Sequence, residues 1–125
     1  MSNTEIENEL KNNKIFRGVF MRDTLPSDPW KQELGIINLD ESEGKGTHWC
    51  LWYTTRNKSY YFDSFGHHPP KELIQYLRND VWYSTFQMQE IGTNYCGHLC
   101  VILAKLISKN KDFATSVYLL KNSLQ

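Results

Sequence analysis

Apolar and polar positions recur along the chain with spacings that predict short strands in its first half. Residues 15–22 mix apolar and polar side chains and residues 34–39 form a β-branched run, so each is expected to be a strand. The aromatic-rich segments 48–54 and 59–62, joined by a short polar link, predict a β-hairpin. Residues 81–89 are rich in strand-forming side chains and are also expected to be extended.

Helical spacing dominates the remainder of the chain. Apolar residues repeat every three or four positions in three segments: 71–79, from Cys96 onward, and 112–124. These residues are Leu73, Ile74, Leu77, Leu99, Ile102, Leu103, Leu106, Ile107, Phe113, Val117 and Leu120. Residues 1–14 are polar and acidic and are expected to be a frayed or weakly helical lead-in to a single domain over 15–125. The order of elements predicts an α+β fold, a small, mostly antiparallel sheet packed against helices.

Composition narrows the classes of function. The chain has 125 residues, with 14 basic and 14 acidic side chains and no formal net charge. This balance argues against non-specific electrostatic binding to nucleic acid. No apolar run approaches the roughly 20 residues that span a bilayer, and the N-terminus lacks an apolar signal segment. We therefore expect no membrane partner and no secretion, and reduced rather than disulfide-bonded cysteines.

His48 and Asp63 stand at the two ends of the predicted hairpin that meet. His48 opens one strand and Asp63 follows the other, so antiparallel pairing would bring their side chains together. A carboxylate beside an imidazole fixes its tautomer and stabilises its charged form. Each residue also has a purely structural interpretation. A histidine next to a tryptophan is often a packing residue, and an aspartate after a strand commonly caps a turn.

Cys96 begins the long apolar helix and is followed by Gly97. The unpaired N–H groups of a first helical turn lower the pKa of a thiol placed there, and the thiolate is the reactive form. Gln89, seven residues upstream, could supply a side-chain amide to a developing oxyanion, with Gln87 as its rival. Together with His48 and Asp63, these residues have the composition of an acyl-transfer site.

Other interpretations of the same residues remain open. Cys96, His98 and Cys100, with His67 and His68, could suggest zinc, but their spacing fits no zinc motif and His98 would point away from the other two. We therefore expect no metal ion. Cys50 is expected to pack within a strand and Cys100 within a helix. The aromatic strands could resemble a base-stacking platform, but without a basic surface packing explains them better.

Three motifs together resemble the adenovirus-type cysteine proteases, or adenains. They are Gly-Thr-His-Trp at 46–49, Tyr-Phe-Asp-Ser-Phe-Gly at 61–66, and Gln89 followed by Cys96-Gly97. The resemblance spans about residues 15–107 and is greatest to the proteases of Maverick/Polinton elements and virophages. The order of these residues along the chain, His, Asp, Gln and then Cys-Gly, is shared more distantly with proteases that process ubiquitin-like modifiers.

The resemblance implies a papain-like protease fold and a role for each matched residue. Cys96 would be the nucleophile, His48 the general base, Asp63 its orienting partner and Gln89 part of the oxyanion hole. The backbone of Gly46 and Thr47 would hold an extended substrate, with Trp49 beside it. Relatives cleave viral structural precursor polypeptides during particle maturation, which implies a location in the infected cell's cytoplasm or nucleus, or in the virion.

The chain also departs from adenain. Only 29 residues follow Cys96, and the net charge is zero, whereas the adenovirus enzyme is basic and activated on DNA. Neither Cys50 nor Cys100 matches the cysteine that binds adenain's activating peptide, so no cofactor is carried over. Two other hypotheses stay open: a deconjugating protease for a ubiquitin-like modifier, and a non-catalytic binding module on the same fold.

Overall fold

The computed structural model describes residues 1–40, 48–88, 95–110 and 112–124. Its elements follow the predicted order, with one additional helix at the start. They are α1 (Asn3–Leu10), β1 (Phe16–Met21), β2 (Glu33–Asn38), β3 (Trp49–Thr54), β4 (Ser59–Phe62), α2 (Lys71–Leu77), β5 (Val81–Tyr83), α3 (Cys96–Asn110) and α4 (Phe113–Ser123).

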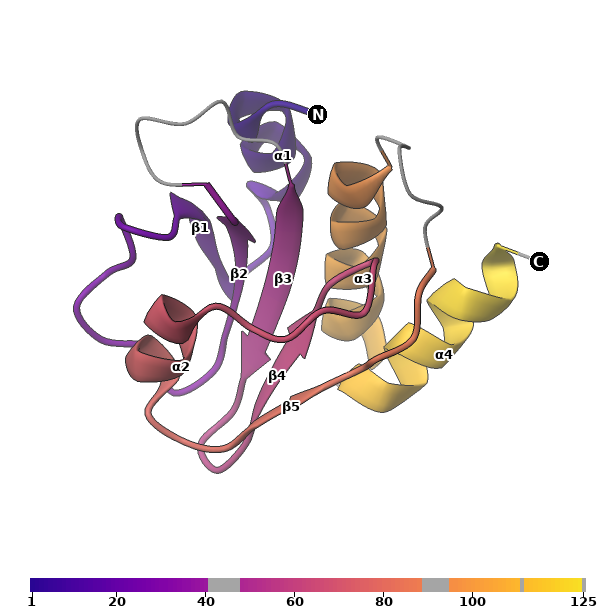
Figure 1. The fold of residues 1–125 in the computed structure, drawn as a ribbon. Coiled ribbons are helices and arrows are strands. Elements are labelled where there is room, and N and C mark those ends of the chain that lie inside the picture. Colours follow the sequence, from indigo (N-terminus) through magenta and orange to yellow (C-terminus); the bar gives the residue numbers. More distant parts are fainter. Residues whose placement is uncertain (41–47, 89–94, 111, 125) are drawn as a thin grey trace.

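The strands form one five-stranded sheet in the order β1-β2-β3-β4-β5 (Figure 1). The central strands β2, β3 and β4 pair antiparallel, whereas β1 and β5 run parallel to their neighbours at the two edges. The α+β class is confirmed, and the parallel edges make the sheet more mixed than expected. The link between the parallel strands β4 and β5 contains α2, the usual form of such a crossover, whereas the fully described link between the parallel strands β1 and β2 contains no helix.

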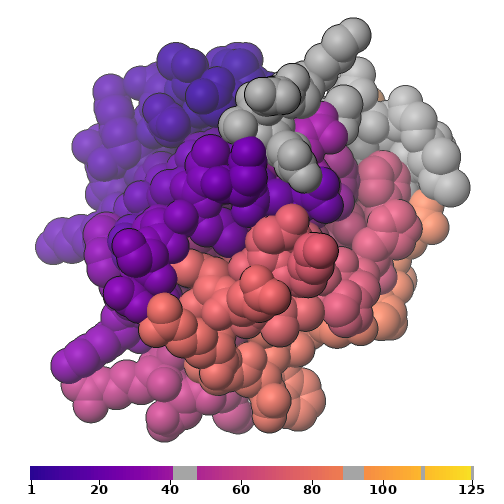
Figure 2. Space-filling view, turned by 60° about the vertical axis from the view of Figure 1, so that its left-hand side comes forward, coloured from indigo at the N-terminus to yellow at the C-terminus, as the bar shows by residue number. Residues whose placement is uncertain are grey.

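The central strand β3 is buried on both faces. Its odd-numbered residues Trp49, Leu51 and Tyr53 belong to the main hydrophobic cluster beneath α3, while Cys50 and Trp52 belong to a smaller cluster beneath α2. Figure 2 views the molecule from the side of α2, where the N-terminal third of the chain borders this helix. Burial on both faces explains why this segment is a continuous apolar run rather than an alternating one.

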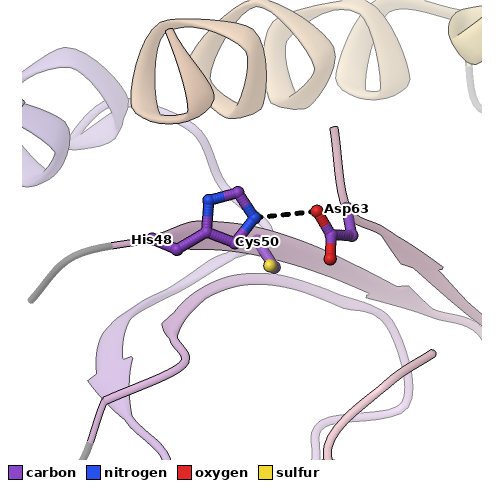
Figure 3. Close-up of side chains that lie close together, drawn as sticks. All are labelled: His48, Cys50 and Asp63. Atoms are coloured by element: carbon purple, nitrogen blue, oxygen red, sulfur yellow. Dashed lines mark hydrogen bonds and ion pairs between the residues drawn. The ribbon is translucent and has the colours of Figure 1, made fainter. Parts of the chain in front are cut away.

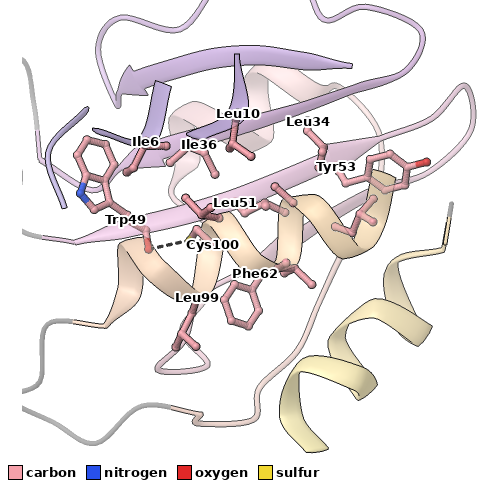
Figure 4. Packing of buried hydrophobic residues seen from close by; sticks show 14 of the residues in the cluster. Ile6, Leu10, Leu34, Ile36, Trp49, Leu51, Tyr53, Phe62, Leu99 and Cys100 are labelled. Atoms are coloured by element: carbon pink, nitrogen blue, oxygen red, sulfur yellow. Dashed lines mark hydrogen bonds between the residues drawn. The ribbon is translucent and has the colours of Figure 1, made fainter. Parts of the chain in front are cut away.

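The main cluster joins α3 to the sheet and to α1 (Figure 4). Ile6 and Leu10 of α1 are completely buried in this cluster, so the segment expected to be a frayed or weakly helical lead-in contributes to the core. Its N-terminus carries a capping box in which Ser2 and Glu5 each accept a hydrogen bond from the other's backbone N–H. Residues four positions apart lie on one face of a helix, so both apolar side chains of α1 point into the same cluster.

Two further details differ from the expectations. The strand expected over 81–89 ends at Tyr83, after which the chain passes beside the turn that follows β4, and the Met88 N–H donates to the Ser64 carbonyl at 2.7 Å. Ile102, expected on the apolar face of α3, is 46% exposed. Among the described residues, no helix is both long and apolar enough to cross a membrane.

Candidate active site

His48 and Asp63 meet where β3 begins and β4 ends. His48 directly precedes β3, Asp63 directly follows β4, and these strands are antiparallel neighbours. The His48 Nε2 and Asp63 Oδ1 atoms lie 2.7 Å apart, the distance of a strong hydrogen bond (Figure 3). The predicted juxtaposition of these two side chains is therefore present.

The turn after β4 fixes the Asp63 carboxylate. Its Oδ1 atom also accepts the Phe65 N–H at 2.9 Å, and the Phe65 ring stacks on the His48 imidazole with centroids 4.9 Å apart. Gly66 closes the turn with a φ of 77° and donates its N–H to the Asp63 carbonyl. A Cβ atom at Gly66 would lie only 2.4 Å from the Thr85 carbonyl oxygen, so glycine is required by space as well as by φ.

Cys96 is the first residue of α3 and is 7% exposed. Burial by itself raises the pKa of its thiol, but a hydrogen bond with His48 and the Trp49 N–H, 3.5 Å from Sγ, outweigh burial and lower that pKa. The N–H of Gly97, in the first turn of the helix, acts in the same direction. A thiol in this setting is a stronger nucleophile at neutral pH than an ordinary cysteine.

His48 connects the carboxylate to the thiol. Burial alone would lower the pKa of its imidazole, but hydrogen bonds to Asp63 and Cys96 raise this pKa to about 9. Because Nε2 faces Asp63, the other ring nitrogen is the one available to Cys96. A charged imidazole beside this thiol would stabilise the thiolate form of Cys96.

The other two cysteines lie in different surroundings. Cys50 and Cys100 are completely buried, as expected from their apolar neighbours, and burial raises the pKa of both thiols. Cys100 donates from Sγ to the Trp49 carbonyl oxygen at 3.4 Å. Neither thiol has an environment that activates it.

Trp49 lies beside Cys96, but its side chain is almost completely buried. The indole N–H donates to the Met1 carbonyl at 2.9 Å, and the ring also packs near Gly97. Its backbone, rather than its ring, touches the thiol. Gly46, Thr47 and Gln89, the other predicted site residues, lie outside the described residues, and the rival Gln87 is exposed.

The sequence matches no protein-family model and no curated protein. Solved structures that resemble the fold include two of one protease. The crystal structure of the ASFV pS273R protease aligns with a TM-score of 0.63 at 13% identity, covering 93% of this chain and 60% of that one. The selenomethionine form of the same protease aligns with a TM-score of 0.56 at 19% identity, covering 71% of this chain and 39% of that one. The chain shares this protease's fold and spans less than two thirds of its length.

The zinc arrangement considered from the sequence does not form. Cys96 and Cys100 are buried on one side of α3, whereas His98 is exposed. A different group was missed: the ligand atoms of His48, Cys50 and Asp63 lie within 4.8 Å of one another (Figure 3). The available signal was the two-residue spacing of His48 and Cys50, which puts both side chains on one side of an extended segment.

Proposed function

We propose that this chain is a cysteine protease in which Cys96 is the nucleophile, His48 the general base and Asp63 the residue that orients His48. The observation that carries the proposal is the 2.7 Å hydrogen bond between His48 and Asp63, together with the Cys96 thiol at the start of α3, whose pKa is lowered by His48 and backbone N–H groups despite burial. The fold shared with the ASFV pS273R protease supports a proteolytic rather than another acyl-transfer reaction.

The reaction follows from the protonation states of the pair. The Cys96 thiolate attacks a peptide carbonyl carbon, and the His48 imidazolium protonates the departing amine. Neutral His48 then takes a proton from water, which attacks the thioester and releases the acid and the free thiol. Asp63 keeps the imidazole oriented through both steps by accepting its Nε2–H.

Two donors would stabilise the tetrahedral oxyanion: the backbone N–H of Cys96 and the side chain of Gln89. Support for Gln89 comes from its neighbour Met88, whose N–H is held by the Ser64 carbonyl at 2.7 Å, one residue after Asp63. An extended substrate would lie along the backbone of Gly46 and Thr47, close to Trp49.

The proposed substrates are viral structural precursor polypeptides cleaved during particle maturation. The resemblance to adenain-like proteases of Maverick/Polinton elements and virophages supports this substrate class, as does the viral protease with the same fold. Zero net charge favours peptide recognition without DNA. The three-group mechanism itself requires no cofactor.

The test is limiting iodoacetamide at neutral pH, followed by peptide mapping of the label. We expect Cys96 to be alkylated well before Cys50 and Cys100, and His48→Ala to abolish that preference. His98→Ala is the matched control, because His98 is exposed on α3 two residues after Cys96. Equal labelling of all three cysteines, or selective labelling that survives His48→Ala, would contradict the proposed site.

A further inference from the structure

The buried carboxylate of Asp63 has one oxygen whose hydrogen-bonding capacity is unused. Oδ1 accepts from His48 and Phe65, but Oδ2 accepts no hydrogen bond within the described part of the chain, although the side chain is fully buried. A buried carboxylate oxygen without a hydrogen bond is unfavourable, and a bound cation is one way to satisfy it. In Figure 3 the second carboxylate oxygen is turned to the side on which Cys50 Sγ lies.

Nitrogen and sulfur ligand atoms lie close to this carboxylate. The ligand atoms of His48, Cys50 and Asp63 lie within 4.8 Å of one another, and His67 Nδ1 lies 3.6 Å from Asp63 Oδ2. That last distance is too long for a hydrogen bond, but it is close to the ligand–ligand separation of about 3.4 Å in tetrahedral zinc sites with bonds near 2.1 Å. Cysteine, histidine and carboxylate are the ligands that zinc prefers.

We propose that this cluster binds a zinc-like divalent cation through His48, Cys50, Asp63 and His67, and that the bound cation switches off the active site. The site differs from the Cys96–His98–Cys100 arrangement suggested by sequence spacing. His67 is 71% exposed, so its side chain is free to turn inward and the cation can enter from solvent on its side.

Inhibition follows from competition for one nitrogen atom. His48 Nε2 cannot coordinate a cation and donate to Asp63 Oδ1 at the same time, so binding breaks the 2.7 Å hydrogen bond. Cys50 binds as a thiolate and releases its proton to the buffer. The imidazole then holds the metal instead of a proton, and Cys96 loses the imidazolium that stabilises its thiolate. This inhibitory role rests on the proposed protease function, whereas the metal site itself does not.

The binding test uses Co²⁺ as the probe and the full-length Cys96→Ala protein, in which the active-site thiol is absent. We expect a cobalt–thiolate charge-transfer band that Cys100→Ser leaves in place and Cys50→Ser removes. Since Cys50 is buried and its replacement could disturb folding, His67→Ala provides a second variant at an exposed position. It should weaken Co²⁺ binding by about 10-fold or more. A band that persists without Cys50, or an affinity unchanged by His67→Ala, would overturn the site.

The inhibition test measures the alkylation rate of Cys96 in the otherwise intact protein as Zn²⁺ is titrated. Each variant is compared with its own metal-free rate. We expect Zn²⁺ to slow alkylation, and His67→Ala to require about 10-fold more Zn²⁺ for the same effect. The same Zn²⁺ dependence in wild type and His67→Ala would refute the switch. Cobalt bound through Cys50 in a protein whose Cys96 shows no selective reactivity would retain the site and reject the protease proposal.

Discussion

Cys96 and Cys100 lie one turn apart on α3, and both contact the backbone of Trp49. Cys96 Sγ accepts the Trp49 N–H, whereas Cys100 Sγ donates to the Trp49 carbonyl. The pKa of the first thiol is lowered and that of the second is raised. Burial raises the pKa of both thiols, but only at Cys96 do an imidazole and backbone N–H groups outweigh it; Cys100 is completely buried and has a backbone acceptor.

The largest expected effect is the loss of the proposed nucleophile. Cys96→Ala should reduce peptide hydrolysis by about 10⁵-fold or more, because no other described thiol is activated. Cys100→Ser is the matched change one turn away, and it should leave turnover within a few-fold of wild type. Comparable losses in both variants would mean that the contrast between the two cysteines has no catalytic meaning.

Asp63→Asn should have the next largest effect. The amide cannot stabilise the imidazolium and can favour the wrong tautomer, so turnover should fall by about 10³- to 10⁴-fold while Cys96 remains alkylatable. Steady-state hydrolysis and iodoacetamide labelling measure the two properties separately. Asp28→Asn, at an exposed carboxylate paired with Arg78, is the control and should change neither. Wild-type turnover in Asp63→Asn would rule out the orienting role.

A smaller effect is expected at the proposed oxyanion donor. Gln89→Ala should lower turnover by about 10²- to 10³-fold with little change in Cys96 alkylation, because the lost amide acts on the tetrahedral intermediate. Gln87→Ala provides the comparison two residues earlier. A greater loss in Gln87→Ala than in Gln89→Ala would reverse this assignment.

The smallest effect is on stability and is measured by urea unfolding at several pH values. In a Cys96→Ala background, we expect the hydrogen bond to Asp63 to keep the pKa of His48 above its ordinary 6.5. Charged His48 therefore stabilises the folded protein most fully below pH 6.5, and this contribution is lost as pH rises through the folded-state pKa.

The free energy of unfolding of Cys96→Ala should accordingly exceed that of Cys96→Ala/His48→Gln at low pH, with the gap narrowing toward alkaline pH. The Cys96→Ala background is needed because the lowered pKa of this thiol acts in the opposite direction. A gap that stays constant with pH would show that the His48–Asp63 bond does not depend on charge.

The sequence predicted the fold and the paired side chains well where the pattern was local. The hairpin of β3 and β4 and the start of α3 at Cys96 are each marked by neighbouring residues, and antiparallel pairing then brings His48 to Asp63. The burial of α1 was missed because it depends on contacts of Ile6 and Leu10 with elements distant in sequence. Strand propensity over 81–89 was likewise overridden when the backbone of Met88 bonded to Ser64 instead.

The cluster of metal-ligand atoms around Asp63 could not be predicted from local sequence patterns either. Strand alternation relates His48 to Cys50, but only the turn after β4 brings His67 within 3.6 Å of the Asp63 carboxylate. The stacking of Phe65 on His48 depends on the same turn. Site residues supplied by a turn are difficult to predict, since their side-chain directions depend on the turn's backbone conformation.

Gly66 has a consequence for how this protein tolerates sequence change. It carries no functional group, yet a single added methyl would press against Thr85, in the segment that leads from β5 toward Cys96, and move it relative to the turn that holds Asp63. In a saturation-mutagenesis library selected for cleavage, position 66 should therefore accept almost no replacement, as if it were itself a reacting residue. Its selection profile would match that of Cys96, although only space and backbone conformation, and no reacting group, are involved.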